Sequence, residues 1–311
     1  MSLPHVYCIG EALLDIIFEK CQPRYATPGG SMLNSAVSLG RAGIPVYLIS
    51  DFANDQTGDL INDFLLRNGV STQYVKRYDH GKTAIALAFL DDEQNASYSF
   101  YKDYPINRFP KCVPEIHPGD FVLFGSFYSI TPSLHDEIIA FVRHARENGA
   151  FILYDPNFRK PHLDNLERLR PLIIENISNA DMVRGSNEDF QIIFGTKNFE
   201  EAFMSVKNAG CNMLVYTKNK DDVEAFIHDE KFSASIPSIN PLSTIGAGDA
   251  FNAGLIYGIL LSPNHTGLPH SIRMDDIVRM GIRFSTEVCL NLENYISLEF
   301  ANSIIQEFSK P

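Results

Sequence analysis

Apolar strand-like segments alternate with amphipathic helical segments along most of this chain. Near the start, strands are predicted over residues 6–9 and 46–50, with helices from Ser31 and over 56–68. Because a strand, a helix and a further strand build parallel pairs, this rhythm predicts an α/β fold with a mostly parallel central sheet. The rhythm resumes with predicted strands over 121–124, 151–155, 182–184, 213–217, 223–227 and 232–236, and with predicted helices over 132–148, 274–291 and 298–308.

Residues 72–102 interrupt this alternation with a β-hairpin pattern. The segments 83–90 and 97–101 are rich in strand-forming residues, and the polar residues 91–95 lie between them as a turn. We interpret this hairpin as part of a small lid, because a cover over the carboxyl ends of the core strands would exclude water from a ligand. The predicted boundaries are 13–24 and 72–102 for the inserted β lid, and 1–12, 25–71 and 103–311 for the α/β core.

The segment Ser243–Phe251 reads STIGAGDAF and opens a helix of small residues. Gly246 and Gly248 permit a tight turn, and the first amides of the helix, including that of Ala247, have no partner within the helix. Such amides at the positive end of a helix dipole bind anions, and Asp249 among them is placed to take a proton. The segment therefore indicates phosphoryl transfer, although a plain helix start with Asp249 facing the dipole also explains it.

A second segment supplies the features of a substrate site. Residues 28–43 carry Gly29 and Gly30 at the start of another helix of small residues, with Asn34 one turn in. Upstream, the apolar strand 6–9 is followed after a few residues by Asp15. Carboxylate and carboxamide groups orient sugar hydroxyls well, because hydroxyl groups both donate and accept hydrogen bonds.

Together, GAGDAF at 246–251 and GGSMLN at 29–34 resemble the motifs of the PfkB-type, or ribokinase-like, carbohydrate kinases. The resemblance extends over nearly the whole chain. Within the family, GEALLD at 10–15 and YDPNFR at 154–159 are most similar to fructokinases and their 2-keto-3-deoxygluconate kinase relatives. The resemblance implies a ribokinase-like three-layer fold with a small β-sheet lid. It also implies an ATP-dependent sugar kinase that transfers the γ-phosphate to a sugar hydroxyl, with fructose as the leading acceptor.

The resemblance also assigns roles to individual residues. Asp249 is expected to be the catalytic base, and Gly246, Ala247 and Gly248 the anion hole. The residues expected to bind the sugar are Asp15, Gly29, Gly30, Asn34, Tyr101, Asn157 and Arg159. ATP and Mg²⁺ are the expected cofactors, and Asn187, Thr217, Gly246 and Gly248 are expected to bind the nucleotide.

The metal prediction depends on an acidic residue near Asn187. Phe190 stands where the family's Asn-x-x-Glu motif would place its glutamate, so Glu188 or Asp189 replaces it, and Glu188 is our metal candidate, acting through water.

Some positions differ from the family pattern. Ser243 stands where many members have an aspartate, and Asn219 and Asp222 replace glycines beside the nucleotide. Other acceptors therefore stay open: 2-keto-3-deoxygluconate, ribose or a nucleoside. A non-catalytic, sugar-binding regulatory relative is the alternative from another class, and the retained Asp249 favours the kinase.

Charge and composition limit the kinds of molecule that this protein is expected to bind. The formal net charge of −12 and the sequence pI near 5.2 argue against a nucleic acid or an anionic membrane as partner. Five cysteines without metal-ligand spacing, an amino terminus without a signal sequence and no membrane-length apolar run favour a cytoplasmic location. The expected partners are thus a small-molecule sugar and ATP. By resemblance the lid could pair two copies in a homodimer, and a monomer is the equal alternative.

Overall fold

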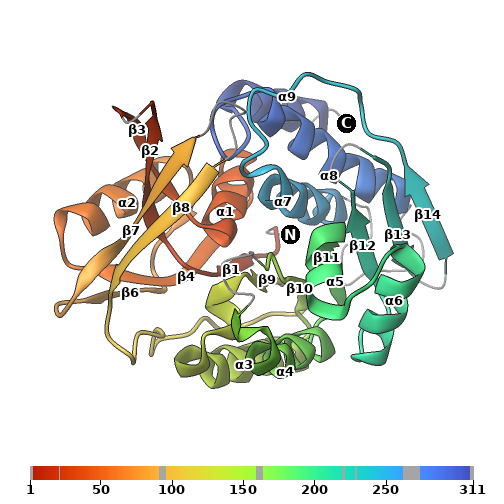
Figure 1. Ribbon diagram of the computed structural model, residues 1–311, viewed down its shortest axis with the longest axis horizontal. Helices are drawn as coiled ribbons and strands as arrows, with labels where there is room; N and C mark the ends of the chain where they lie inside the picture. The colour runs from red at the N-terminus through yellow and green to blue at the C-terminus, as the bar shows by residue number, and fades with distance from the viewer. Residues whose placement is uncertain are drawn as a thin grey trace.

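The computed structural model describes residues 3–20, 22–90, 96–158, 164–218, 221–227, 230–261 and 274–308. Within them, the main sheet has the strand order β14-β13-β12-β11-β10-β9-β1-β4-β5, with β6 also paired to β4 (Figure 1). The pairs from β12 to β5 are parallel, and the pairs β12–β13 and β13–β14 are antiparallel, which confirms the predicted mostly parallel sheet. The bounds are β1 Val6–Ile9, β4 Val46–Ala53, β5 Val70–Ser71, β6 Val75–Tyr78, β9 Phe121–Gly125, β10 Phe151–Asp155, β11 Met182–Ser186, β12 Leu214–Thr217, β13 Val223–Ile227 and β14 Glu230–Ala234.

The central strands are apolar on both sides because helices cover both faces of the sheet. In β1, Val6 and Cys8 join one hydrophobic cluster, whereas Tyr7 and Ile9 join the other. Side chains alternate between the two faces of a strand, so a short apolar run serves two cores at once.

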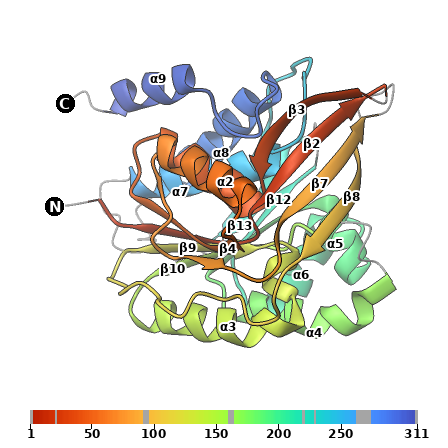
Figure 2. The ribbon, with the colours of Figure 1, turned by 90° about the vertical axis from the view of Figure 1, so that its left-hand side faces the viewer.

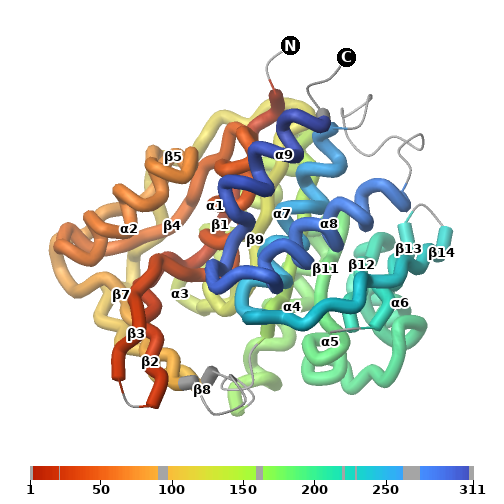
Figure 3. The backbone as a smooth tube through the Cα atoms, turned by 90° about the horizontal axis from the view of Figure 1, so that it is seen from above, coloured from red at the N-terminus to blue at the C-terminus, as the bar shows by residue number. Residues whose placement is uncertain are grey.

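Helices from the two ends of the chain cover one face of the main sheet, and helices from its middle cover the other. The first group is α1 Ser31–Arg41, α2 Gln56–Arg67, α7 Ala247–Leu260, α8 Met274–Cys289 and α9 Leu298–Phe308. The second group is α3 Pro132–Glu147, α4 Leu166–Ser178, α5 Asn187–Phe194 and α6 Phe199–Asn208. In Figure 3, α8 lies beside α7 and α9 beside α1. This packing brings α1 and α7, which carry the two glycine-containing motifs, into contact.

A separate small sheet has the strand order β3-β2-β7-β8. Its strands are β2 Leu13–Glu19, β3 Gln22–Gly29, β7 Lys82–Leu90 and β8 Ala96–Asp103, and β2 pairs parallel to β7. Figure 2 shows these four strands projecting beyond the main sheet. Two distant segments thus build one small sheet, as predicted, whereas the predicted turn 91–95 lies outside the described residues. The boundaries 13–24 and 72–102 of the lid stay a prediction, and β6 within the second range pairs with β4 of the main sheet.

No helix in the described ranges is both long and apolar enough to cross a bilayer.

Candidate active site

The helix α7 begins at the predicted anion site. Gly246, immediately before it, has a φ of 81°, a left-handed conformation that favours glycine. Ala250 N–H donates to the Gly246 carbonyl at 2.8 Å, and Ala247 N–H donates to the Thr244 carbonyl at 3.3 Å. The Gly248 N–H has no acceptor among the described residues. The positive end of the helix dipole therefore presents a backbone donor for an anion.

Asp249 is buried, and residues of α1 hold its carboxylate. Ser31 Oγ donates to Oδ1 at 2.6 Å, and Asn34 Nδ2 donates to Oδ2 at 2.9 Å. A third bond, from Ser35 Oγ to the Asp249 carbonyl at 2.8 Å, ties the two helices together. The structure thus brings the predicted base and the predicted sugar ligand Asn34 into direct contact. Asn34 Oδ1 is buried without a partner among the described residues, so it can receive a hydroxyl group.

The glycine pair before α1 lies against residues that follow β1. A Cβ at Gly29 would be 2.0 Å from Asp15 Oδ2, and a Cβ at Gly30 would be 2.1 Å from the Glu11 carbonyl oxygen. Gly30 also has a φ of 126°, which disfavours any other residue. Asp15 lies in β2 of the small sheet, so its carboxylate reaches the start of α1 from the lid side.

Lys102 and Tyr101 of β8 point to opposite faces of the small sheet. Asp15 and Phe100 both pair with Ala86, which places Lys102, two residues after Phe100, on the same face as Asp15. Lys102 Nζ lies 2.8 Å from the carboxylate of Glu11. Tyr101 is on the other face and is 61% exposed. The structure therefore places Asp15 and Lys102 on one face of the small sheet and Tyr101 on the other.

Arg184, which sequence reasoning did not select, lies among residues predicted to bind the nucleotide. Its Nη1 donates to Asp155 Oδ2 at 3.0 Å and its Nη2 donates to Thr217 Oγ1 at 2.9 Å. A Cβ at Gly248 would be 2.7 Å from Nη1, so the guanidinium group lies against the start of α7. An arginine at the end of the otherwise apolar segment 182–184 was the available signal, because the carboxyl ends of parallel strands face the ligand.

Several polar atoms around Arg184 are buried without a hydrogen-bond partner. They are Arg184 Nε, Asn187 Oδ1 and Asn252 Oδ1. Asn252 is fixed through its other atom, because Nδ2 donates to Asp155 Oδ2 at 2.6 Å. Buried polar atoms are normally paired, so this group fits a polar ligand such as the phosphates of a nucleotide. Of the predicted nucleotide residues, Asn187 at the start of α5 supplies one of these atoms, and Thr217 at the end of β12 accepts from Arg184.

The two acidic residues at the start of α5 differ in position. Glu188 is exposed, whereas Asp189 is buried and accepts from Ser186 N and Oγ at 2.8 and 2.6 Å and from Phe158 N at 2.7 Å. Burial, together with the charge of nearby Asp155, raises the pKa of Asp189. Asp189 rather than Glu188 therefore faces the interior beside Arg184. Phe190 packs in the core against Tyr216.

Asn157 follows β10 and has a φ of 38°, and its N–H donates to Asp155 Oδ1 at 3.0 Å. This bond places Asn157 at the same strand end as the Arg184 group. Arg159, the other predicted residue of this segment, lies outside the described residues.

The donor set suits magnesium bound together with a nucleotide. The described residues contain no group of three or more His, Cys, Asp or Glu side chains that could hold a metal ion. Magnesium bound with ATP keeps most of its waters and takes its remaining ligands from the phosphates. The unpaired Asn187 Oδ1 could receive such a water, whereas both oxygens of the buried Asp189 carboxylate already accept from Phe158 and Ser186.

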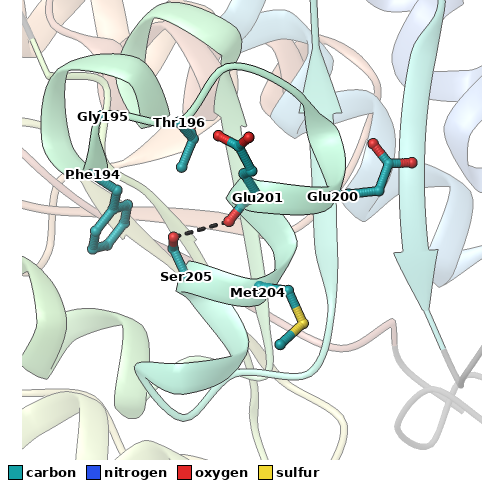
Figure 4. A pocket seen from close by; sticks show the side chains of 7 residues that line it. All are labelled: Phe194, Gly195, Thr196, Glu200, Glu201, Met204 and Ser205. Atoms are coloured by element: carbon teal, nitrogen blue, oxygen red, sulfur yellow. Dashed lines mark hydrogen bonds between the residues drawn. The ribbon is translucent and has the colours of Figure 1, made fainter.

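A surface hollow of about 430 Å³ lies elsewhere, between the end of α5 and α6 (Figure 4). It is lined by Phe194, Gly195, Thr196, Glu200, Glu201, Met204 and Ser205. None of these residues belongs to the predicted site. The length of α5, about 12 Å for its 8 residues, separates the hollow from Asn187.

Comparisons with known proteins agree with this geometry. A model of the "pfkB family carbohydrate kinase" matches residues 4–296. A fructokinase from Escherichia coli is 29% identical over 260 residues, which cover 82% of this chain and 84% of that protein. Among solved structures, fructokinase with bound ATP from Xylella fastidiosa has a TM-score of 0.83 at 22% identity, covering 98% of this chain and 99% of that one. The aminoimidazole riboside kinase from Salmonella enterica, complexed with aminoimidazole riboside and an ATP analog, has a TM-score of 0.81 at 18% identity, covering 99% and 100%. The chain therefore belongs to the pfkB family of carbohydrate kinases and is a sugar kinase with the ribokinase-like fold.

Proposed function

We propose that this protein transfers the γ-phosphate of ATP to a hydroxyl group of an uncharged sugar, with fructose as the leading candidate. The observation that carries the proposal is the position of the Asp249 carboxylate. Ser31 and Asn34 fix it at the start of α7, where the Gly248 amide and the Arg184 guanidinium face the same space. A base and an anion site thus meet at one point, as phosphoryl transfer needs.

On the acceptor side, Asp15, Asn34 and the Gly29–Gly30 backbone would orient the sugar. Asp249 would take the proton from the reacting hydroxyl group as its oxygen bonds to the γ-phosphorus. Ser31 Oγ occupies Asp249 Oδ1 at 2.6 Å, so Ser31 marks the position that the sugar hydroxyl would share or take over. Asn157 and Arg159 are proposed to line the same cleft.

On the phosphate side, the amides at Gly246, Ala247 and Gly248 would stabilise charge on the transferred group. Arg184 adds a positive charge beside them, and Asn187 and Thr217 would contact the nucleotide phosphates. Mg²⁺ bound with ATP would neutralise the negative charge of the phosphate oxygens. We propose that Asn187 Oδ1 orders water around the ion and that Asp189, in place of the exposed Glu188, is the acidic residue beside it.

Charge pairing supports an uncharged acceptor. Lys102 lies 2.8 Å from Glu11, and Arg108, in the loop after β8, lies 2.8 Å from Asp51. Each cation is thus neutralised by a carboxylate, and Asp15 adds a negative charge. An acidic sugar such as 2-keto-3-deoxygluconate favours an unpaired cation, which Lys102 and Arg108 do not supply; Arg159, outside the described residues, would have to supply it, so this sugar is the weaker candidate. Aminoimidazole riboside, named for a structural relative, is uncharged in its sugar part and stays the second candidate.

We also propose a homodimer that pairs the small sheets. The face opposite Asp15 carries the exposed apolar side chains of Phe89 and Tyr101, which are 40% and 61% exposed. Exposed apolar residues on a sheet favour association with a second sheet. Sedimentation of the wild type and of Phe89→Glu tests this, because the charge should shift a dimer to a monomer. A wild-type protein that sediments as a monomer overturns it.

An ADP-release assay with ATP and Mg²⁺ tests the proposed reaction against fructose, ribose, 2-keto-3-deoxygluconate, aminoimidazole riboside and adenosine. Turnover is expected with fructose. Asp249→Asn keeps the size of the side chain and should lower turnover by roughly 100-fold to 10,000-fold while sugar binding, measured by calorimetry, persists. An unchanged rate excludes Asp249 as the base. Sugar binding without any turnover in the wild type would favour the non-catalytic alternative.

A further inference from the structure

The loop that returns from β8 to β9 is tied to the main sheet by a buried ion pair. Arg108 Nη1 donates to both carboxylate oxygens of Asp51, at 3.0 and 2.8 Å. The two side chains are only 3% and 1% exposed. Asp51 lies near the carboxyl end of β4, the edge of the sheet where ligands bind. Because desolvation of two charges is costly, such a pair is retained only where further contacts compensate for it.

Two tyrosines supply those contacts. Tyr128, which follows β9, donates its hydroxyl to Asp51 Oδ2 at 2.8 Å. The Arg108 guanidinium carbon lies 3.7 Å from the ring centroid of Tyr104 and 5.1 Å from that of Tyr128. We call Asp51, Tyr104, Arg108 and Tyr128 the Arg108 cluster. It joins the loop after the small sheet to the ends of two core strands.

The Arg108 cluster continues directly into the acceptor site. Lys102, the residue before the last of β8, lies beside Glu11, whose carbonyl oxygen lies against Gly30. Tyr104 lies between Lys102 and Arg108 in the sequence, so the chain leaves β8 and enters the cluster within a few residues. The position of the cluster thus sets where the Asp15 and Lys102 face of the small sheet lies relative to Gly30.

We propose that Asp51 and Arg108 are positioning residues that hold the small sheet over the acceptor site and keep water away from the γ-phosphate. An apolar anchor would tolerate sliding, whereas two hydrogen bonds to one carboxylate and a stacked ring fix both distance and orientation. The kinetic part of this inference rests on the proposed kinase function.

Loss of this anchor has a defined chemical consequence. In place of the sugar hydroxyl, a water oxygen attacks the γ-phosphorus, and the bond from that phosphorus to the bridging oxygen of ADP breaks. ADP and inorganic phosphate are released, and the water proton passes to the solvent. The ratio of this hydrolysis to sugar phosphorylation therefore measures how well the small sheet covers the site.

The informative variant is the double substitution Asp51→Asn with Arg108→Met. It removes both charges, so no buried charge is left unpaired and the protein can fold. The single substitution Arg108→Lys keeps the positive charge, so it should preserve part of the anchoring that the double variant loses. The matched control is Arg143→Met with Glu175→Gln, which removes a 2.7 Å ion pair between α3 and α4.

We expect the acceptor KM of the double variant to rise about tenfold, because misplaced binding groups weaken orientation of the acceptor. The KM for ATP should stay unchanged, and the fraction of ATP hydrolysed without sugar transfer should increase several-fold. Amide hydrogen exchange of β7 and β8 should become faster in the variant without any ligand. The control variant should change none of these quantities.

A folded double variant with unchanged acceptor KM, unchanged hydrolysis fraction and unchanged exchange of β8 would overturn the proposal. Hydrogen exchange separates this failure from failure of the proposed reaction. If the wild type phosphorylates no sugar, faster exchange of β7 and β8 in the variant still supports the anchor, and unchanged exchange refutes it.

Discussion

Two buried arginine–carboxylate pairs flank the active site, and their surroundings differ. Arg108 directs one nitrogen to both oxygens of Asp51 and stacks on Tyr104. Arg184 shares Asp155 with Asn252 and also reaches Thr217. The Arg184 pair has the start of α7 beside it, and unpaired atoms of Asn187 and Asn252 lie in the same region, whereas the Arg108 pair is enclosed by aromatic rings.

This difference indicates two roles for a buried arginine–carboxylate pair: fixing the backbone and binding an anion. The Arg108 pair is packed against two aromatic rings that leave little space for a ligand, so it fixes the backbone that carries it, although Arg108 Nε, like Arg184 Nε, has no hydrogen-bond partner among the described residues. The Arg184 pair lies beside the start of a helix, with unpaired atoms of Asn187 and Asn252 in the same region, and this arrangement suits an anionic ligand. We therefore expect substitution of Arg108 to affect stability first and substitution of Arg184 to affect the reaction first.

The largest expected effect is on stability. Arg108→Met leaves the Asp51 charge buried with only the Tyr128 hydroxyl as partner, which should lower the free energy of unfolding by about 3–5 kcal/mol. Denaturant titration measures this loss. Adding Asp51→Asn should recover most of it, and a double variant as unstable as Arg108→Met would show that lost packing, not an unpaired charge, is the cause.

The next effect concerns catalysis. Arg184→Met should lower kcat/KM for ATP by roughly 100-fold to 1,000-fold, about 2.7–4 kcal/mol, because a cation beside the transferred phosphate is lost. Asp155 keeps two donors, Asn252 Nδ2 and the Asn157 N–H, whereas Asp51 would keep one, so the loss of stability should be smaller than for Arg108→Met. Steady-state kinetics with varied ATP, together with calorimetric sugar binding, tests this. If sugar affinity falls by the same factor as kcat/KM for ATP, Arg184 instead maintains the structure of the site, as we expect for Arg108.

The smallest expected effect tests the contact between Arg184 and the start of α7. Gly248→Ala places a methyl group 2.7 Å from the present position of Nη1, and the guanidinium group must move. We expect kcat/KM for ATP to fall about tenfold, or about 1.4 kcal/mol. In a double-mutant cycle with Arg184→Met, the methyl group should add little further loss. Additive losses would instead assign the effect to the helix backbone.

Much of the fold followed from local patterns. The strands at 6–9, 151–155 and 223–227 and the helix at 298–308 have the predicted bounds, because apolar runs, alternating strands and amphipathic helices each have a distinctive hydrophobic period. The contact of Asn34 with Asp249 could be expected once each motif was recognised as a helix start. The predicted roles of the site residues stay predictions, and the proposed activity assays address them.

Other features depend on long-range contacts that a single sequence does not contain. Arg184 reads as an ordinary charged strand residue until Asp155, Asn252 and the start of α7 surround it. Whether Glu188 or Asp189 faces inward was decided by the reciprocal cap between Asp189 and Ser186. The opposite directions of Tyr101 and Lys102 depend on the pairing register of β7 and β8, which one residue of slip would reverse.

The parallel pairing of β2 with β7 has a consequence for the order of folding. β2 leaves the sheet directly after β1, but its partner β7 comes only after α1, β4, α2 and β6 have been traversed. Closing so long a loop costs entropy until the intervening core elements bring its ends together. The core nucleus around β1 and β4 should therefore form first, with the small sheet assembling late on the folding pathway.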